Sequence, residues 1–364
     1  MKSRRSLSLA GGVLVVAGAA LVIFAMRRDG PNDLPSADWR EFRSAFISRD
    51  GRVIDTGNGG ISHSEGQGYG MLFAHAYSDR RTFEKLWQWT RTNLQTRPND
   101  KLLSWQWSDN GGNGRVTDAN NACDGDILVA WALTRAAKTW GVFGYTQSAL
   151  EILADLRRLA LVEASGSTFL LPGVEGFRKE EGFILNPSYY VFTALRELDA
   201  AFPGAGWGEL SAPGRELLSQ SRFGKWQLTP DWVFRADNGI VAIAPGFPPD
   251  FSYNAVRIPL YIAWEDPDSP LLAPFAEFWK KPSEGGALPA SVNLQTDAFG
   301  PHPALPGMLA IAKLTQACVA KTPITLSDIP PVKRSEDYYS ACLKILVKMA
   351  ILESRKNLSG GQES

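Results

Sequence analysis

The sequence has no excess of charge of either sign, and it has very little histidine. Its 364 residues include 38 Lys and Arg against 38 Asp and Glu, so the formal net charge is zero. Domains that bind nucleic acid normally present a basic surface, so we expect no nucleic-acid partner. The three histidines, His63, His75 and His302, show no H-x-x-x-H type of spacing. We therefore expect no zinc site, and no motif indicates another metal or a cofactor.

Cysteine is also scarce. Cys123, Cys318 and Cys342 are an odd number, which excludes a complete disulfide framework. Cys318 and Cys342 would pair in an oxidising compartment, or both would remain buried free thiols. The sequence alone leaves these two alternatives open.

The N-terminus carries a long apolar segment. Lys2, Arg4 and Arg5 precede the uncharged stretch 6–26, which ends at Arg27 and Arg28. As a helix this stretch is about 32 Å long, close to the thickness of one hydrocarbon core. We predict a signal anchor or signal peptide over 1–28, in or through the inner membrane, and a short linker over 29–35. The remainder is then periplasmic or extracellular, with 6–26 as its anchor if it is not cleaved.

Helical periodicity dominates the rest of the chain. Phe83, Leu86, Trp87 and Leu94, for example, form one apolar stripe behind a capping Asp79. No run of buried parallel strands alternates with such helices, which disfavours a doubly wound sheet or a TIM barrel. The pattern predicts an all-α toroid with short strands in its loops, such as 103–107 and 168–171, and a flexible tail over 357–364. The expected helices are 37–46, 65–78, 79–94, 124–140, 146–164, 188–202, 207–221, 252–264, 270–282, 305–319 and 336–354.

Aromatic side chains are abundant, with 12 Trp and 9 Tyr. Such rings either fill a core or stack on the faces of sugars. Trp105 and Trp107 alternate in Ser104-Trp-Gln-Trp107, so in an extended strand their rings share one face. A pair of flat faces of this kind suits a polysaccharide groove as well as it suits sheet packing.

Glu65 begins a glycine-rich helix start, Ser64-Glu-Gly-Gln-Gly-Tyr-Gly-Met71. Glycines weaken a helix by up to about 1 kcal/mol each, so they indicate that another backbone or a ligand approaches closely. In a partly apolar pocket, desolvation would raise the pKa of Glu65, as a general acid requires. The alternative is that Ser64 caps the helix and Glu65 only complements its dipole.

Two further segments carry polar groups at helix starts. Asp124 and Asp126 flank Gly125 just before a strongly apolar helix, and capping explains one of these carboxylates but not both. Tyr253, Asn254 and Arg257 are spaced so that all three reach one cleft from a helix start.

Taken together, these motifs resemble glycoside hydrolase family 8, and in particular its periplasmic members that accompany bacterial cellulose synthase. The resemblance covers most of 35–355. It implies an (α/α)6 toroid over 36–356, inverting hydrolysis of internal bonds in a β-1,4-glucan chain, no cofactor, and the synthase export complex as a possible partner. The matching stretches are Ser64–Met71, Ser104–Trp107, Ala122–Leu133, Asn186–Tyr189, Pro230–Trp232 and Ser252–Arg257.

The resemblance also implies roles for individual residues. Glu65 matches the family's proton donor to the glycosidic oxygen, and Asp124 matches the aspartate that holds and distorts the sugar at the cleavage site. The two are the catalytic residues that we expect. The expected substrate-binding residues are Trp105, Trp107, Asp126, Tyr189, Tyr253, Asn254 and Arg257.

The chain departs from the family at the general base. Many members carry Asp in the Tyr-x-Ala-x-Arg segment, where this chain has Asn254, and an amide accepts no proton at ordinary pH. A chitosan-cleaving branch takes its base, a Glu, from elsewhere. We expect Asn254 to orient the water, with the base supplied by another residue. The candidates are Asp118, Asp250, Glu180 and Glu181, and the sequence does not choose among them. Asp124 could be the base as well, but the role that the resemblance implies for it argues against this.

Two alternatives to a cellulose-cleaving enzyme follow from the sequence. The first keeps the fold and changes the substrate to chitosan or xylan, although the neutral net charge disfavours the cationic chitosan chain. The second is a glucan-binding assembly factor with little catalysis, which the amide at Asn254 motivates.

Overall fold

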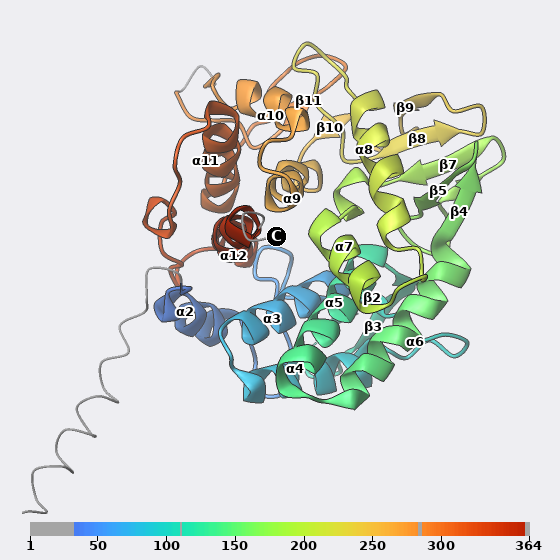
Figure 1. Ribbon diagram of the computed structural model, residues 1–364, viewed down its shortest axis with the longest axis vertical. Helices are drawn as coiled ribbons and strands as arrows, with labels where there is room; N and C mark the ends of the chain where they lie inside the picture. Colours follow the sequence, from blue (N-terminus) through green and yellow to red (C-terminus); the bar gives the residue numbers. More distant parts are fainter. Residues whose placement is uncertain (1–32, 110, 283–285, 361–364) are drawn as a thin grey trace, which may run out of the picture.

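The computed structural model describes residues 33–109, 111–282 and 286–360, and in this part the chain folds into two layers of helices (Figure 1). The predicted signal or anchor segment 1–28 and most of the predicted linker lie outside the described residues. None of the helices in the described part is both long enough and apolar enough to span a membrane. The three cysteines are free thiols, so Cys318 and Cys342 do not pair.

Five helices form the inner layer. α3, α5, α7, α9 and α12 contact one another in this order, and α12 contacts α3, so the ring closes (Figure 1). Nearly every residue of α3 and α9 is buried, as is α5 from Cys123 to Leu133, which explains why these stretches are largely apolar on all sides. Their bounds are Ser64–Ala76 for α3, Cys123–Trp140 for α5, Phe192–Ala201 for α7, Ile258–Glu265 for α9 and Tyr338–Gly360 for α12.

The outer helices surround this ring and bury one face each. In α4, for example, Phe83, Leu86, Trp87 and Thr90 are buried, and Asp79 accepts a hydrogen bond from the backbone N–H of Thr82 as the predicted cap. All eleven predicted helices are therefore present among the described residues, and α12 extends into the predicted tail. The outer helices are α2 (Ser36–Phe46), α4 (Arg80–Asn93), α6 (Phe143–Ala160), α8 (Ser211–Gln220), α10 (Ala273–Phe278) and α11 (Pro306–Ala320).

Short antiparallel strands lie in the loops, as predicted. Three of the four small sheets are β1-β2-β3 (Ser62–His63, Ser104–Ser108, Arg115–Asn121), β4-β5 (Leu161–Ala164, Ser167–Leu170) and β10-β11 (Asp250–Phe251, Val292–Asn293). The fourth is β6-β7-β8-β9, with the bounds Arg178–Lys179, Gly182–Leu185, Val233–Ala236 and Val241–Ile243.

Two inner helices begin later than the periodicity predicts. Residues Pro187–Tyr189 and Ala255–Arg257 form 3-10 turns, so α7 begins at Phe192 and α9 at Ile258. Arg257 is thereby the N-cap residue of α9. The inner helices place their N-terminal ends around one cavity, and the side chains at these ends determine its chemistry.

Candidate active site

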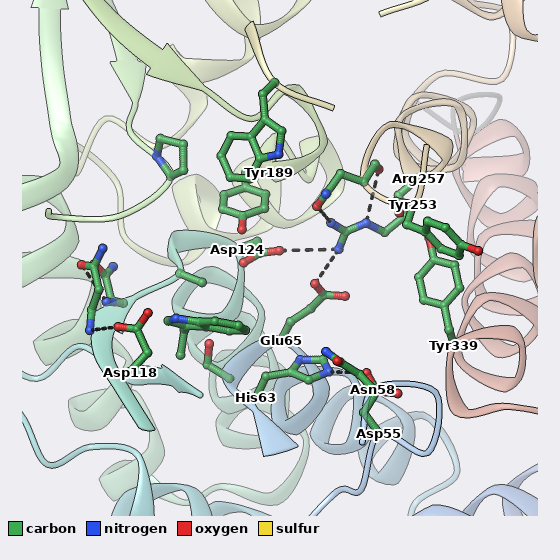
Figure 2. A pocket seen from close by; sticks show the side chains of 18 of the residues that line it. Asp55, Asn58, His63, Glu65, Asp118, Asp124, Tyr189, Tyr253, Arg257 and Tyr339 are labelled. Atoms are coloured by element: carbon green, nitrogen blue, oxygen red, sulfur yellow. Dashed lines mark hydrogen bonds and ion pairs between the residues drawn. The ribbon is translucent and has the colours of Figure 1, made fainter. Parts of the chain in front are cut away.

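A cavity of about 540 Å³ opens at the N-terminal ends of the inner helices (Figure 2). Glu65 comes from the first turn of α3, Asp124 from the first turn of α5, and Arg257 from the start of α9. All three line the cavity. The structure thus brings together the candidates that three separate sequence segments supplied.

Glycine residues allow Glu65 to lie close to Asp124, because they have no side chain. A Cβ atom on Gly125 would lie 2.1 Å from Ser64 Oγ and 2.8 Å from the backbone nitrogen of Glu65. A Cβ atom on Gly68 would lie 2.6 Å from Leu128 Cβ. The glycines therefore allow α3 and α5 to pack at a separation that side chains would prevent. This confirms the prediction that a neighbouring backbone approaches the glycine-rich segment.

Arg257 holds the two carboxyl groups together (Figure 2). Its Nη1 lies 2.7 Å from Glu65 Oε2 and 3.5 Å from Asp124 Oδ2. The same guanidinium donates hydrogen bonds to Tyr69 Oη, Ser188 Oγ and Asn254 Oδ1, the last at 3.0 Å from Nη2. The side chain of Arg257 is 3% exposed, so its charge acts on Glu65 with little screening by solvent.

The electrostatics of Glu65 differ from the sequence prediction. Burial acts to raise its pKa, but the charges of Arg257 and His63 and a hydrogen bond from Asp124 together hold it below the ordinary value. The predicted rise is therefore wrong for the free protein, because Arg257 outweighs desolvation. The pKa of Asp124 is raised well above its ordinary value by burial and by the negative charge of Glu65. The pKa of Asp124 therefore lies above that of Glu65 in the free protein.

His63 caps the catalytic helix, a role that the sequence interpretation gave to Ser64. His63 Nδ1 accepts a hydrogen bond from the backbone N–H of Gly66 at 3.0 Å, and its Nε2 lies 3.4 Å from Asp55 Oδ2. Ser64 Oγ is buried without a hydrogen-bond partner. The sequence signal that was missed is the histidine immediately before the helix start, because histidine is not among the usual capping residues.

Aromatic rings line the other walls. Trp105 and Tyr189 face the cavity as predicted, and Tyr253, which is 45% exposed, lies at its rim. Five further rings line the cavity and were not among the predicted site residues: Phe177, Trp232, Phe247, Tyr338 and Tyr339. Trp232 stacks on Phe247 with 4.6 Å between ring centroids and on Phe177 with 5.8 Å. The five come from three separate loops and the start of α12, so no spacing in the sequence connects them.

Trp107 and Asp126 do not line the cavity. The β2–β3 pairing changes register on both sides of Gln106, so the rings of Trp105 and Trp107 do not share a face. Trp107 is buried against Trp89 instead. Both Asp126 oxygens accept hydrogen bonds, from the Leu103 backbone N–H and from Asn121 Nδ2, each at 2.8 Å. In this structure both residues make contacts within the protein, so substrate binding by Trp107 and Asp126 stays a prediction.

The structure narrows the choice of general base. Of the four predicted candidates only Asp118 lines the cavity. Asp250 pairs with Asn293 in the β10–β11 ladder, whereas Glu180 and Glu181 occupy the turn between β6 and β7. Asp55, which the sequence interpretation did not consider, also lines the cavity. Within 33–109, 111–282 and 286–360, no three His, Cys, Asp or Glu side chains are arranged to hold a metal ion.

Comparisons with known proteins agree with this geometry. A probable endoglucanase from Novacetimonas hansenii is 43% identical over 328 residues, which are 89% of this chain and 93% of that protein. The crystal structure of a family 8 endoglucanase from Klebsiella pneumoniae superposes with a TM-score of 0.80 at 38% identity, covering 87% of this chain and 99% of that one. An endo-β-1,4-glucanase from Acetobacter xylinum gives a TM-score of 0.79 at 43% identity, with 89% and 99% covered.

The family model of the glycosyl hydrolases family 8 matches residues 13–352. A match of this extent includes α3, α5, α7 and α9 in full, α12 as far as residue 352, and every residue that lines the cavity. The chain belongs to glycosyl hydrolases family 8.

Proposed function

We propose that this protein is an endo-β-1,4-glucanase that cleaves internal bonds of a cellulose-like glucan with inversion at the anomeric carbon. The observation that carries the proposal is the contact of Glu65 and Asp124 with one buried arginine, inside a cavity lined by aromatic rings. The relatives named as endoglucanases, at 43% and 40% identity, support the substrate class. The ring of paired helices is, in this proposal, the (α/α)6 toroid.

Glu65 is the general acid. Its side chain is 20% exposed whereas that of Asp124 is 2% exposed, so Glu65 is the carboxyl group that the glycosidic oxygen can reach. A bound glucose unit excludes water from Glu65, which favours its protonated form. A proton held by Asp124, the group with the higher pKa in the free protein, then passes to Glu65 and from there to the leaving oxygen. Asp124, now ionised and close to the sugar, stabilises the positive charge that develops on the ring.

The aromatic walls supply the binding energy. Trp105, Tyr189 and Trp232 offer flat faces on which glucose rings stack, and they bind several units of the chain on either side of the carboxyl pair. Affinity for these outer units can be used to distort the unit at the cleavage site. Short substrates that miss these contacts should therefore show a lower kcat as well as a higher KM.

The test is the anomeric form of the first product. Proton NMR during hydrolysis of cellohexaose should show the α-anomer first, and a β-anomer would contradict inversion. Glu65→Gln should lower kcat by about 10²–10⁴. Asp124→Asn should lower kcat as well, whereas Asp297→Asn, in a loop that does not line the cavity, is the matched control and should leave kcat unchanged.

A second substrate, chitosan, is favoured by one observation. Four carboxyl groups line the cavity, those of Asp55, Glu65, Asp118 and Asp124, against the single guanidinium of Arg257. An acidic cleft attracts a cationic polymer. Loss of viscosity measured in parallel on carboxymethylcellulose, chitosan and xylan decides among these substrates. Binding of cellohexaose without release of reducing ends would instead support a glucan-binding assembly factor.

The proposal extends to the cellular role. The basic N-terminus, the apolar stretch 6–26 and the following Arg27 and Arg28 support export, with 1–28 acting as a signal peptide or as an anchor in the inner membrane. We place the enzyme in the periplasm or outside the cell, working on glucan beside the cellulose synthase export complex. Cell fractionation with alkaline extraction of membranes tests the anchor. Recovery of the full-length protein in the cytoplasm would contradict export.

A further inference from the structure

Asn254 occupies the place where the family resemblance implies a carboxylate base, so another group must accept the proton of the attacking water. Its side-chain oxygen accepts a hydrogen bond from Arg257 Nη2 at 3.0 Å. Since a guanidinium only donates, the amide nitrogen of Asn254 must point to the other side. On that side lies the carboxyl group of Asp231, whose pKa the Asn254 amide lowers and whose Oδ1 binds the backbone N–H groups of Ser252 and Ala255.

Asp231 is fixed to the turn that carries Asn254. It lies between α8 and β8, next to Trp232 in the cavity wall. Its Oδ1 accepts hydrogen bonds from the backbone N–H groups of Ser252 at 3.0 Å and of Ala255 at 2.7 Å. These two donors flank Asn254 in the sequence. The carboxyl group and the amide are therefore held in one rigid unit, which ends at Arg257.

The environment of Asp231 suits a base. Burial raises its pKa to about 6, against the lowering effects of the two backbone hydrogen bonds, of the charge of Arg257 and of Asn254. Burial and the negative charge of Asp231 are among the causes that raise the pKa of the nearby Tyr339 hydroxyl group. A carboxylate with a pKa near 6 accepts a proton more readily than an ordinary aspartate and is still mostly ionised at pH 7.

The two other free carboxylates in the cavity wall lack this connection. Asp118 accepts a hydrogen bond from the backbone N–H of Asn120, and Figure 2 shows it on the opposite side of the cavity from Arg257. Asp55 accepts from the backbone N–H of Gly57 and faces His63, on the same side as Glu65. An inverting hydrolase needs its base across the sugar from its acid, which argues against Asp55. In the described part of the chain Asp118 makes no hydrogen bond or ion pair with the Asn254 turn, where the family resemblance implies the base.

We propose that Asp231 is the proton acceptor for the attacking water and that it acts through Asn254. This inference rests on the proposed hydrolytic function. As the water oxygen bonds to the anomeric carbon, one of its protons passes to Asn254 Oδ1 in concert with the transfer of a proton from Asn254 Nδ2 to the Asp231 carboxylate. The amide thereby becomes a neutral imidic acid and never carries a positive charge. The glycosidic bond breaks in the same step, and its oxygen receives the proton of Glu65. The amide is restored when Asp231 returns a proton to Nδ2 and Oδ1 releases its proton to solvent.

The experiment exchanges the two groups. Asp231→Asn keeps an Oδ1 that accepts the Ser252 and Ala255 N–H groups, so the turn should persist. Its kcat on cellohexaose should fall by about 10²–10⁴, with KM and Tm close to those of the natural protein. The double variant Asp231→Asn, Asn254→Asp places the carboxylate directly at the water, and its kcat should recover at least about tenfold, one factor of ten being 1.36 kcal/mol in the barrier.

Three results would overturn the inference. They are a kcat for Asp231→Asn within about threefold of the natural protein, an exchange variant no faster than Asp231→Asn, and a fall in Tm that accounts for the lost activity. Asp118→Asn and Asp55→Asn serve as rival variants, and a loss confined to one of them would assign the base there. Failure of the hydrolytic function itself is distinguishable, because the natural protein would then cleave none of the three polymers.

Discussion

An arginine lies between two glutamate or aspartate side chains at each end of the inner ring, but the two clusters are built differently. At the end away from the cavity, Arg135 donates four hydrogen bonds to Glu197 and Glu353. Each of these carboxylates also accepts an indole N–H, from Trp131 and Trp264 respectively. Arg135 lies twelve residues along α5 from Cys123, so this cluster is about 18 Å from the helix start.

The cluster in the cavity is left incomplete. Arg257 divides its donors among Glu65, Tyr69, Ser188 and Asn254. Asp124 Oδ2 lies 3.5 Å from Arg257 Nη1 and accepts no hydrogen bond of ordinary geometry from it. The same charged groups are thus structural where the arginine binds both carboxylates at hydrogen-bond distance, and available for chemistry where one carboxyl oxygen is held only loosely.

Removing Arg135 should have the largest effect on stability. Arg135→Ala leaves two partly buried negative charges, Glu197 and Glu353, with one indole N–H each and no cation between them, and we expect a loss of about 3 kcal/mol in the free energy of unfolding. Urea unfolding followed by circular dichroism measures it. The matched control is Arg196→Ala, which breaks the more exposed pair with Glu265 and should change stability by less than about 1 kcal/mol. Equal losses in both variants would contradict the comparison.

Removing Arg257 should affect catalysis more than folding. Arg257→Ala takes away a fixed positive charge beside both carboxyl groups, and we expect kcat/KM to fall by about 10²–10³. The loss of stability should be smaller than for Arg135→Ala, because the raised pKa of Asp124 lets it take up a proton, which leaves one negative charge in the cluster instead of two. Steady-state kinetics and urea unfolding on the same preparation test both parts. A variant that unfolds as easily as Arg135→Ala would show that Arg257 is equally structural.

The end away from the cavity should respond to acid. Burial and the positive charge of Arg135 lower the pKa of His75 from 6.5 to about 4. Below about pH 6.5 the His75 imidazole therefore binds a proton in the unfolded chain but not in the folded protein. The stability of the folded state falls as the pH drops from about 6.5 to about 4. The expected loss is on the order of 2–3 kcal/mol. In His75→Gln this part of the pH dependence should vanish from urea unfolding curves, and an unchanged profile would assign the acid sensitivity to other groups.

The smallest expected change is a gain. Asp124→Asn removes an enclosed carboxyl group that has a loosely held oxygen, and stability should rise by about 0.5–2 kcal/mol while activity is lost. Thermal unfolding at pH 7 measures the gain. A matched change in the complete cluster, Glu353→Gln, should lower stability instead. If both variants shift Tm in the same direction, the two clusters do not differ as we infer.

Most of the fold could be predicted from the sequence, because helical periodicity and capping are local properties. The glycines of the Glu65 segment also indicated a close approach correctly. The errors arise where distant residues meet. No feature of the sequence around Glu65 indicates that Arg257 lies beside it. The charge of Arg257 helps to reverse the expected direction of the pKa shift of Glu65. The face that Trp107 presents depends on irregular pairing with β3, and periodicity cannot show such irregularities.

The Arg135 cluster and the Asp231–Asn254 contact were missed for the same reason. The residues of each come from separate elements and form no motif, so only the folded chain brings them together. The only hint that the sequence offers for the first of them is Arg135, the single charged residue within 127–137 of α5.

The close contact between Gly125 and Ser64 has a consequence for how this family can vary. The gap between the acid and its neighbouring carboxyl group is set by the absence of one methyl group on α5. Even alanine in place of Gly125 would push α3 and α5 apart and increase the distance between Glu65 and Asp124. Variation in substrate preference is therefore more readily accommodated in the loops that carry the aromatic rings, while the spacing of the reacting groups stays constant.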